Sequence, residues 1–198
     1  MKLPHSSLRA GGFSLVEVMV GLVVISVGLL GIAKMQALAM SSTGSAKMRS
    51  LAALEAASLA SAMHADRAYW SAITLATPTN PFVVQTSKSS IVNATDNTLK
   101  TTQTCTLAAP SACTTGQMAA YDLQDWLAGT PNVTAGLSAQ LPNPQSTITC
   151  YQLAATSPVG CIINISWNEN LVSMNTASAN AATVAQVEAT SYTLYVEP

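Results

Sequence analysis

The chain has 198 residues and a formal net charge of −1, and only 9% of its residues are charged. Its length suits one domain with an appendage, because a typical domain contains about 100–150 residues. A chain with no basic excess has no strong electrostatic basis for binding nucleic acid, so we expect no nucleic-acid partner.

A short basic leader occupies residues 1–12 and ends in two glycines. Glu17 follows shortly afterwards, and the next charged residue is Lys34. A charge at the centre of a membrane helix costs about 2.5–3.5 kcal/mol, and ionisable residues in such segments are usually functional. Glu17 is therefore the first candidate functional residue.

A long helix is predicted from about Ser14 to Tyr69, because this span lacks proline and is rich in Ala, Leu, Met, Val and Gln. Unbroken, it would be roughly 84 Å long at 1.5 Å per residue, so its first half should protrude from a small domain. Low helix propensity in residues 41–45 predicts a bend or local melting there.

The two halves of this helix differ in character. Residues 13–40 are expected to form the transmembrane and assembly half, in which residues 13–33 are apolar apart from Glu17 and, at 21 residues, long enough to cross a bilayer. Residues 41–70 are amphipathic, with a stripe that could lie on a globular head. Either Leu54 or Glu55 belongs to that stripe, and the pattern leaves the choice open.

Three glycines lie on the same side of the predicted helix as Glu17. With about 100° per residue, Gly21, Gly28 and Gly31 all fall within about 40° of Glu17. Small residues allow membrane helices to approach closely. The face could accommodate a neighbouring helix, although glycine is also common in membrane helices generally.

The segment Gly12-Phe13-Ser14-Leu15-Val16-Glu17-Val18 resembles the prepilin motif of type IV pilins and type II secretion pseudopilins. The resemblance implies that a membrane peptidase cuts after Gly12 and methylates the new N-terminal residue, Phe13. It also implies that Glu17 meets the N-terminal amine of a neighbouring subunit during assembly. Pairing would offset the burial penalty of both charges. The alternative is that Glu17 only stabilises the start of the helix.

A conventional secretory signal is the competing interpretation of the N-terminus. It would be cut after Ala39, within Ala37-Leu38-Ala39, and would leave an exported binding protein or enzyme. The long apolar run, Glu17 inside it and Lys34 before the cut all disfavour this reading.

The four cysteines all lie in the second half of the chain: Cys105, Cys113, Cys150 and Cys161. An even number behind an export-like segment predicts two disulfides formed in an oxidising compartment. Of three connectivities the local one is favoured, because Cys105–Cys113 and Cys150–Cys161 each bracket a short loop with a proline. These spacings do not match the knuckles of a zinc site.

Residues 71–198 are expected to form a periplasmic α+β head with these two disulfides. Thr114 and Gln117 predict a capping box that opens a short helix, which Gly129 ends. Strands are predicted at Phe82–Val84 (weak), Ile148–Leu153, Cys161–Trp167, Val184–Ala189 (weak) and Tyr192–Val196. The expected fold is thus a long N-terminal helix packed at its C-terminal half against a small antiparallel sheet.

Parts of the chain are similar to PilV-type minor pilins, also called type IV pilus modification proteins. The similarity lies in Gly28–Gly31, in Ala112 to Trp126 and in the strand ending Ile165-Ser166-Trp167. It implies a role in pilus assembly or priming, and in adhesion, twitching motility or natural transformation. Many major pilins have a proline in the N-terminal helix, and its lack here favours a minor component.

The implied partners are other minor pilins, the major pilin, the prepilin peptidase and methylase, and the assembly platform. The implied location is the bacterial inner membrane, crossed once with the head in the periplasm, and later the filament. A type II secretion minor pseudopilin, part of a short periplasmic piston, is the nearest alternative.

No pattern typical of a catalytic or metal centre is found. The chain has two histidines, His5 and His64, and no G-x-S-x-G motif. Asp122 and Asp125 fit an exposed polar helix face, and Asp96-Asn97 lacks the other ligands of a calcium loop. We therefore expect no enzymatic activity, no cofactor and no metal.

Overall fold

The computed structural model describes residues 12–73, 76–105, 113–129, 135–170 and 187–198. It contains a long N-terminal helix followed by a small five-stranded antiparallel sheet, which confirms the predicted α+β class. The chain divides into two compact units, one ending at Thr43 and the other beginning at Gly44, and each is described separately.

Helix α1 (Leu15–Ala65) supplies residues to both units. The predicted local melting at residues 41–45 is wrong, because these residues are helical. The Thr43 hydroxyl donates a 2.8 Å hydrogen bond to the Ala39 carbonyl, so the side chain is satisfied within the helix. The helix ends at Ala65, earlier than predicted, and the one-turn helix α2 (Arg67–Trp70) follows.

The sheet has the strand order β2-β1-β3-β4-β5, with every neighbouring pair antiparallel. Its strands are β1 (Phe82–Ser87), β2 (Ser90–Ala94), β3 (Gln145–Tyr151), β4 (Gly160–Asn170) and β5 (Val187–Val196). The β3–β4 hairpin is confirmed. The prediction of two separate C-terminal strands is wrong, because Val187–Val196 is a single strand that pairs with β4. Residues 184–186 of the first predicted strand lie outside the described residues.

Helix α3 (Thr115–Ala128) has the predicted capping box. The Thr114 hydroxyl accepts a hydrogen bond from the Gln117 N–H, and the Gln117 side-chain oxygen accepts one from the Thr114 N–H, at 3.3 and 2.9 Å. Gly129 ends the helix with a φ of 78°, as predicted. The short helices η1 (Asn97–Lys100) and α4 (Leu137–Gln140) and strand β2 were not predicted.

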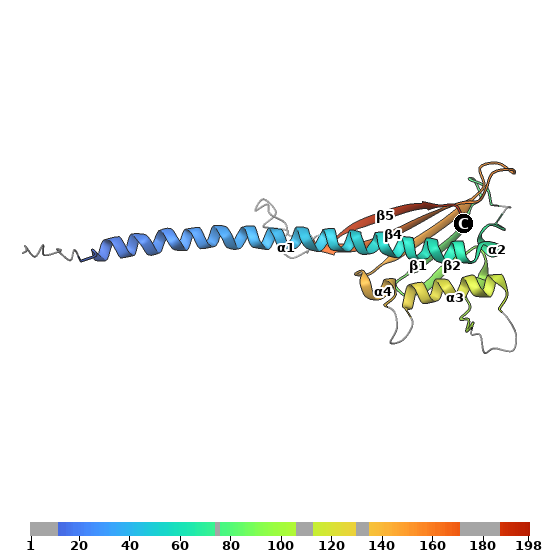
Figure 1. Cartoon of the computed structure of the whole chain (residues 1–198), viewed down its shortest axis with the longest axis horizontal. Helices are drawn as coiled ribbons and strands as arrows, with labels where there is room; N and C mark the ends of the chain where they lie inside the picture. Colours follow the sequence, from blue (N-terminus) through green and yellow to red (C-terminus); the bar gives the residue numbers. More distant parts are fainter. Residues whose placement is uncertain (1–11, 74–75, 106–112, 130–134, 171–186) are drawn as a thin grey trace, which may run out of the picture. The chain divides into compact units, whose positions relative to one another are not determined.

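One hydrophobic core joins the sheet, α3 and the part of α1 after Gly44 (Figure 1). Alternate residues of β3 and β4, such as Ile148, Ile163 and Trp167, are fully buried on one face of the sheet. Helix α1 contributes mainly small and aliphatic side chains to this core: Ala52, Ala56, Leu59, Ala60 and Met63. Burial on one face only is typical of an antiparallel sheet whose other face meets solvent.

Both disulfides of the structure follow the local pairing. Cys105 is bonded to Cys113, just before α3, and Cys150 is bonded to Cys161 across the β3–β4 pair. The first disulfide links Cys105 to a residue just before the start of α3, and the second links the neighbouring strands β3 and β4.

Candidate assembly site on the N-terminal helix

Glu17 lies in the first turn of α1. Its backbone N–H donates to the Ser14 carbonyl at 3.0 Å, which fixes the residue at the start of the helix. The side chain is exposed, and no described residue forms a hydrogen bond or ion pair with its carboxylate. A negative charge in this turn is favourable for the helix dipole. The carboxylate is therefore unpaired within the described part of the chain.

The predicted cleavage point lies just before the helix. Gly12 and Phe13 are both exposed, and the Phe13 side chain is 85% accessible. Residues 1–11 of the leader lie outside the described residues. A cut after Gly12 would place a new amine four residues before Glu17, at the N-terminal end of α1.

The glycines on the Glu17 side are not explained by packing within the chain. A Cβ atom added at Gly21, Gly28 or Gly31 would meet no described atom within 4 Å. Glycine in a helix interior costs about 1 kcal/mol relative to alanine. The chain therefore keeps three weak helix formers where nothing of its own requires them.

The apolar half of α1 buries none of its large side chains. Exposed hydrophobic residues cover every side of the helix, among them Val18, Val20, Val23, Ile25, Leu29 and Leu30. Within the described residues α1 is the one helix long and apolar enough to cross a membrane. A helix that is apolar all round needs lipid or other helices as its surroundings.

The second half of α1 is fixed to the head through two buried carboxylates. Glu55 is only 8% exposed, whereas Leu54 is 63% exposed, so Glu55 is the residue that faces the head. The Gln140 side-chain amide donates to the Glu55 carboxylate, and the Trp126 indole donates to the Glu55 carbonyl at 2.9 Å. Burial raises the pKa of Glu55, and hydrogen bonds from Gln140 and Trp126 partly oppose that rise.

Glu169, near the end of β4, is the second buried carboxylate. The Ser45 hydroxyl of α1 donates to one of its oxygens, and the Trp167 indole donates to the other at 2.9 Å. Sequence reasoning did not find either contact, because the partners of Ser45 and Glu55 lie 124 and 85 residues away.

Several aspartates lie near α2, which itself carries Arg67. Burial, and then the charges of Asp66 and Asp125, raise the pKa of Asp122. Burial also acts on Asp96, but hydrogen bonds from Thr98 and Tyr69 outweigh it and lower the pKa of that carboxyl. Asp122 and Asp125 are half-buried, so the prediction that they lie on an exposed polar helix face is wrong. No group of three His, Cys, Asp or Glu among the described residues is placed to hold a metal ion.

Comparison with known sequences gives one match. Residues 8–33 match the family described as the prokaryotic N-terminal methylation motif. No curated protein and no solved structure matches the chain significantly. The motif covers Gly12, Phe13 and Glu17, and it implies processing by a prepilin peptidase and anchoring in a membrane. Together with the apolar helix and the α+β head, it supports a type IV pilin-like family for this chain.

Proposed function

We propose that this protein is a minor pilin of a type IV pilus. The observation that carries the proposal is a methylation motif placed on a helix whose apolar half is not buried by any of the described residues. After cleavage between Gly12 and Phe13 and methylation of Phe13, this helix enters the filament or its priming complex. Its work is assembly through helix–helix packing, and no enzymatic step is involved.

Glu17 pairs with the N-terminal amine of a neighbouring subunit in this proposal. Each group is costly to bury alone in an apolar filament core, and the pair offsets much of that cost. The side of α1 that carries Gly21, Gly28 and Gly31 receives the neighbouring helix. The support for this is the open space at all three glycines, where an added Cβ atom would meet none of the described atoms within 4 Å.

A minor subunit of the PilV type fits the residues better than a bulk subunit. The helix has no proline from Phe13 to Ala65, and Ala112 to Trp126 resembles the corresponding PilV-type segment. Its partners would be the major pilin, other minor pilins, the peptidase and the assembly platform. Two disulfides in the head support a periplasmic position beyond a single inner-membrane span. Adhesion or twitching motility would be the output.

The mass of the mature protein tests this proposal. We expect intact-mass and peptide spectrometry to find a chain that begins at Phe13 and carries one methyl group on its amine. A mature chain that begins at Met40 would overturn the proposal in favour of a conventional signal peptide. A type II secretion pseudopilin would share the methylated Phe13. Deletion of the gene would then impair protein secretion and leave the sheared pili intact.

The Glu17 pair is tested by Glu17→Gln, which removes the charge and keeps the size. Losing one partner of a buried pair costs about 3–5 kcal/mol, so we expect at least a roughly tenfold loss from sheared filaments. Processing and methylation should continue. Glu197→Gln, which neutralises an exposed carboxylate of the head, is the control and should leave incorporation unchanged. Normal incorporation of Glu17→Gln would contradict the pairing.

A further inference from the structure

The outer face of the sheet carries two uncharged polar rows. The register places Asn93, Gln85, Thr147, Asn164 and Thr193 side by side across all five strands. The next row consists of Ser87, Gln145, Ser166 and Ser191. All nine side chains are exposed or half-buried amides and hydroxyls. The Asn164 amide donates to the Thr193 hydroxyl at 2.8 Å, so the groups already form hydrogen bonds along the row.

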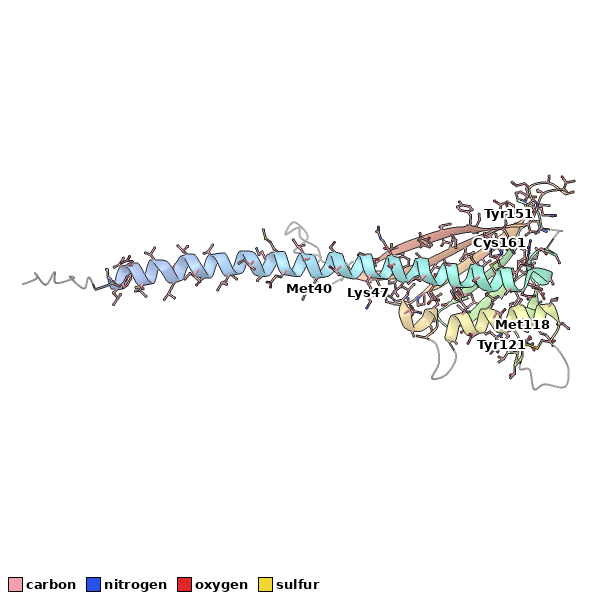
Figure 2. All side chains as sticks on the ribbon, viewed as in Figure 1. Met40, Lys47, Met118, Tyr121, Tyr151 and Cys161 are labelled. Atoms are coloured by element: carbon pink, nitrogen blue, oxygen red, sulfur yellow. A yellow bond between two sulfur atoms is a disulfide. The ribbon has the colours of Figure 1, made fainter. Side chains whose placement is uncertain are left out.

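A hollow of about 420 Å³ lies at one end of this face. Its lining includes Tyr151, Leu153, Gly160, Ile162, Tyr195 and Glu197. Tyr195 and Leu153 are 75% and 79% exposed, so both side chains are open to a ligand. Figure 2 labels Tyr151 and Cys161 at this end of the sheet. The volume falls in the range of small-molecule sites, which is about 300–1,000 Å³.

Gly160 helps to make the hollow. It is the register partner of Tyr151, and a Cβ atom at this position would meet no described atom within 4 Å. The missing side chain leaves open space at this position, which is the first residue of β4.

The lining matches the chemistry of a neutral sugar. A sugar ring has an apolar C–H face, which can stack on a tyrosine ring or pack on Ile162, and hydroxyls that need hydrogen-bond partners. Tyr151, Tyr195 and Ser157 supply hydroxyls in the hollow, and the polar rows supply amides and hydroxyls beyond it. Glu197 is the one charged side chain in the lining, and it would repel sialic or uronic acids.

We infer that this hollow and the adjoining polar rows bind a neutral oligosaccharide. The inference rests on the adhesive part of the proposed function and names the ligand class for it. A chain of several sugars would place one ring in the hollow and extend toward the polar row that contains Asn164 and Thr193. An uncharged partner suits a face whose two polar rows carry no charge.

The test uses the full mature chain in phospholipid nanodiscs, because sugar-headed detergents would compete for the site. The probes are fluorescent tetrasaccharides of glucose, galactose and N-acetylglucosamine, with a sialylated tetrasaccharide for comparison, and binding is read by anisotropy. We expect at least one neutral probe to bind more tightly than the sialylated one. Gly160→Val adds a branched side chain at a position where a Cβ would meet no described atom, and it should weaken that binding at least about tenfold by narrowing the hollow.

Two further variants keep the test decisive. Tyr195→Ala removes an exposed ring and should weaken binding even if Gly160→Val lowers stability. Val92→Ala removes an exposed side chain on edge strand β2 and should leave binding unchanged. The inference is overturned if no neutral probe binds at about 10 mM, if the sialylated probe binds best, or if binding survives both variants. Self-association that Gly160→Val abolishes would also overturn it, by assigning the hollow to another subunit. None of these results bears on methylation of Phe13, so the two proposals fail separately.

Discussion

Glu55 is a carboxylate buried on a helix face that otherwise contributes Ala, Leu and Met side chains to the core. Its hydrogen-bond partners are neutral, and burial raises its pKa. We expect Glu55→Gln to raise the free energy of unfolding at pH 7 by on the order of 1 kcal/mol. The side-chain amide oxygen of the new glutamine can still accept a hydrogen bond from Gln140, and no charge is then buried in the core. Urea unfolding followed by tryptophan fluorescence measures this, since all three tryptophans are buried in the head.

The pH dependence of Glu55→Gln separates charge from packing. A raised pKa means that the folded state binds the Glu55 proton more tightly than the unfolded state does. The stabilisation that comes from the protonated carboxyl is therefore complete below the ordinary pKa of 4.5 and is lost as pH rises through the folded pKa. The advantage of glutamine should therefore be small below pH 4.5 and grow toward pH 7. A difference that is constant across this range would contradict the explanation. Glu197→Gln, at an exposed carboxylate, provides the matched control.

The backbone at Gly136, just before α4, passes close to the C-terminal end of α3. A Cβ atom there would lie 2.3 Å from the Gly129 nitrogen and 2.5 Å from the Ala128 carbonyl carbon, both backbone atoms that cannot move aside cheaply. We expect Gly136→Ala to destabilise the head by about 1–3 kcal/mol in urea unfolding. Gly160→Ala is the control, because its Cβ meets nothing and the loss of chain freedom should stabilise by about 0.4–1 kcal/mol. Equal effects of the two changes would contradict the close approach.

Elements with local signals could be predicted from the sequence, and elements decided by distant partners could not. The capping box of α3 and the β3–β4 hairpin depend on residues close in the chain, and both are confirmed. Strand β2 is an edge strand of only five residues within a Ser/Thr/Asn-rich part of the sequence, and its pairing with β1 is what makes it a strand. Strand β5 includes Thr190 and Ser191, which look like a break, but pairing along β4 keeps them in one strand.

The same distinction between local signals and distant partners applies to the candidate functional residues. Gly12, Phe13 and Glu17 lie in one contiguous motif, so neighbouring residues are enough to single them out, and their roles stay a prediction. The burial of Glu55 could not be predicted, because the apolar stripe of the helix fitted Leu54 equally well. Contacts with Gln140 and Trp126 decide which of the two residues faces the head. The hollow beside Gly160 likewise needs three strands in register before its lining comes together.

The two units of the molecule differ in what they bury. The head has its own core and two disulfides, whereas the unit ending at Thr43 leaves its apolar helix surface uncovered. Such a surface is stable only in lipid or among other helices. Contacts among the described residues therefore stabilise the head, and in the proposed function the apolar helix is covered by lipid or by helices of other subunits.

This difference gives a test of the glycine face that leaves the head intact. Gly28→Leu adds a large side chain where the chain itself has open space, so membrane insertion and urea unfolding of the head should not change. If a neighbouring helix approaches this face closely, the variant should fall at least about threefold in sheared filaments while it accumulates in the membrane fraction. Immunoblots of the two fractions measure the ratio. Ala33→Leu is the matched control, because Ala33 lies about 160° from Glu17 around the helix. Equal losses for both variants would show that any added bulk disturbs assembly and would contradict a specific glycine face.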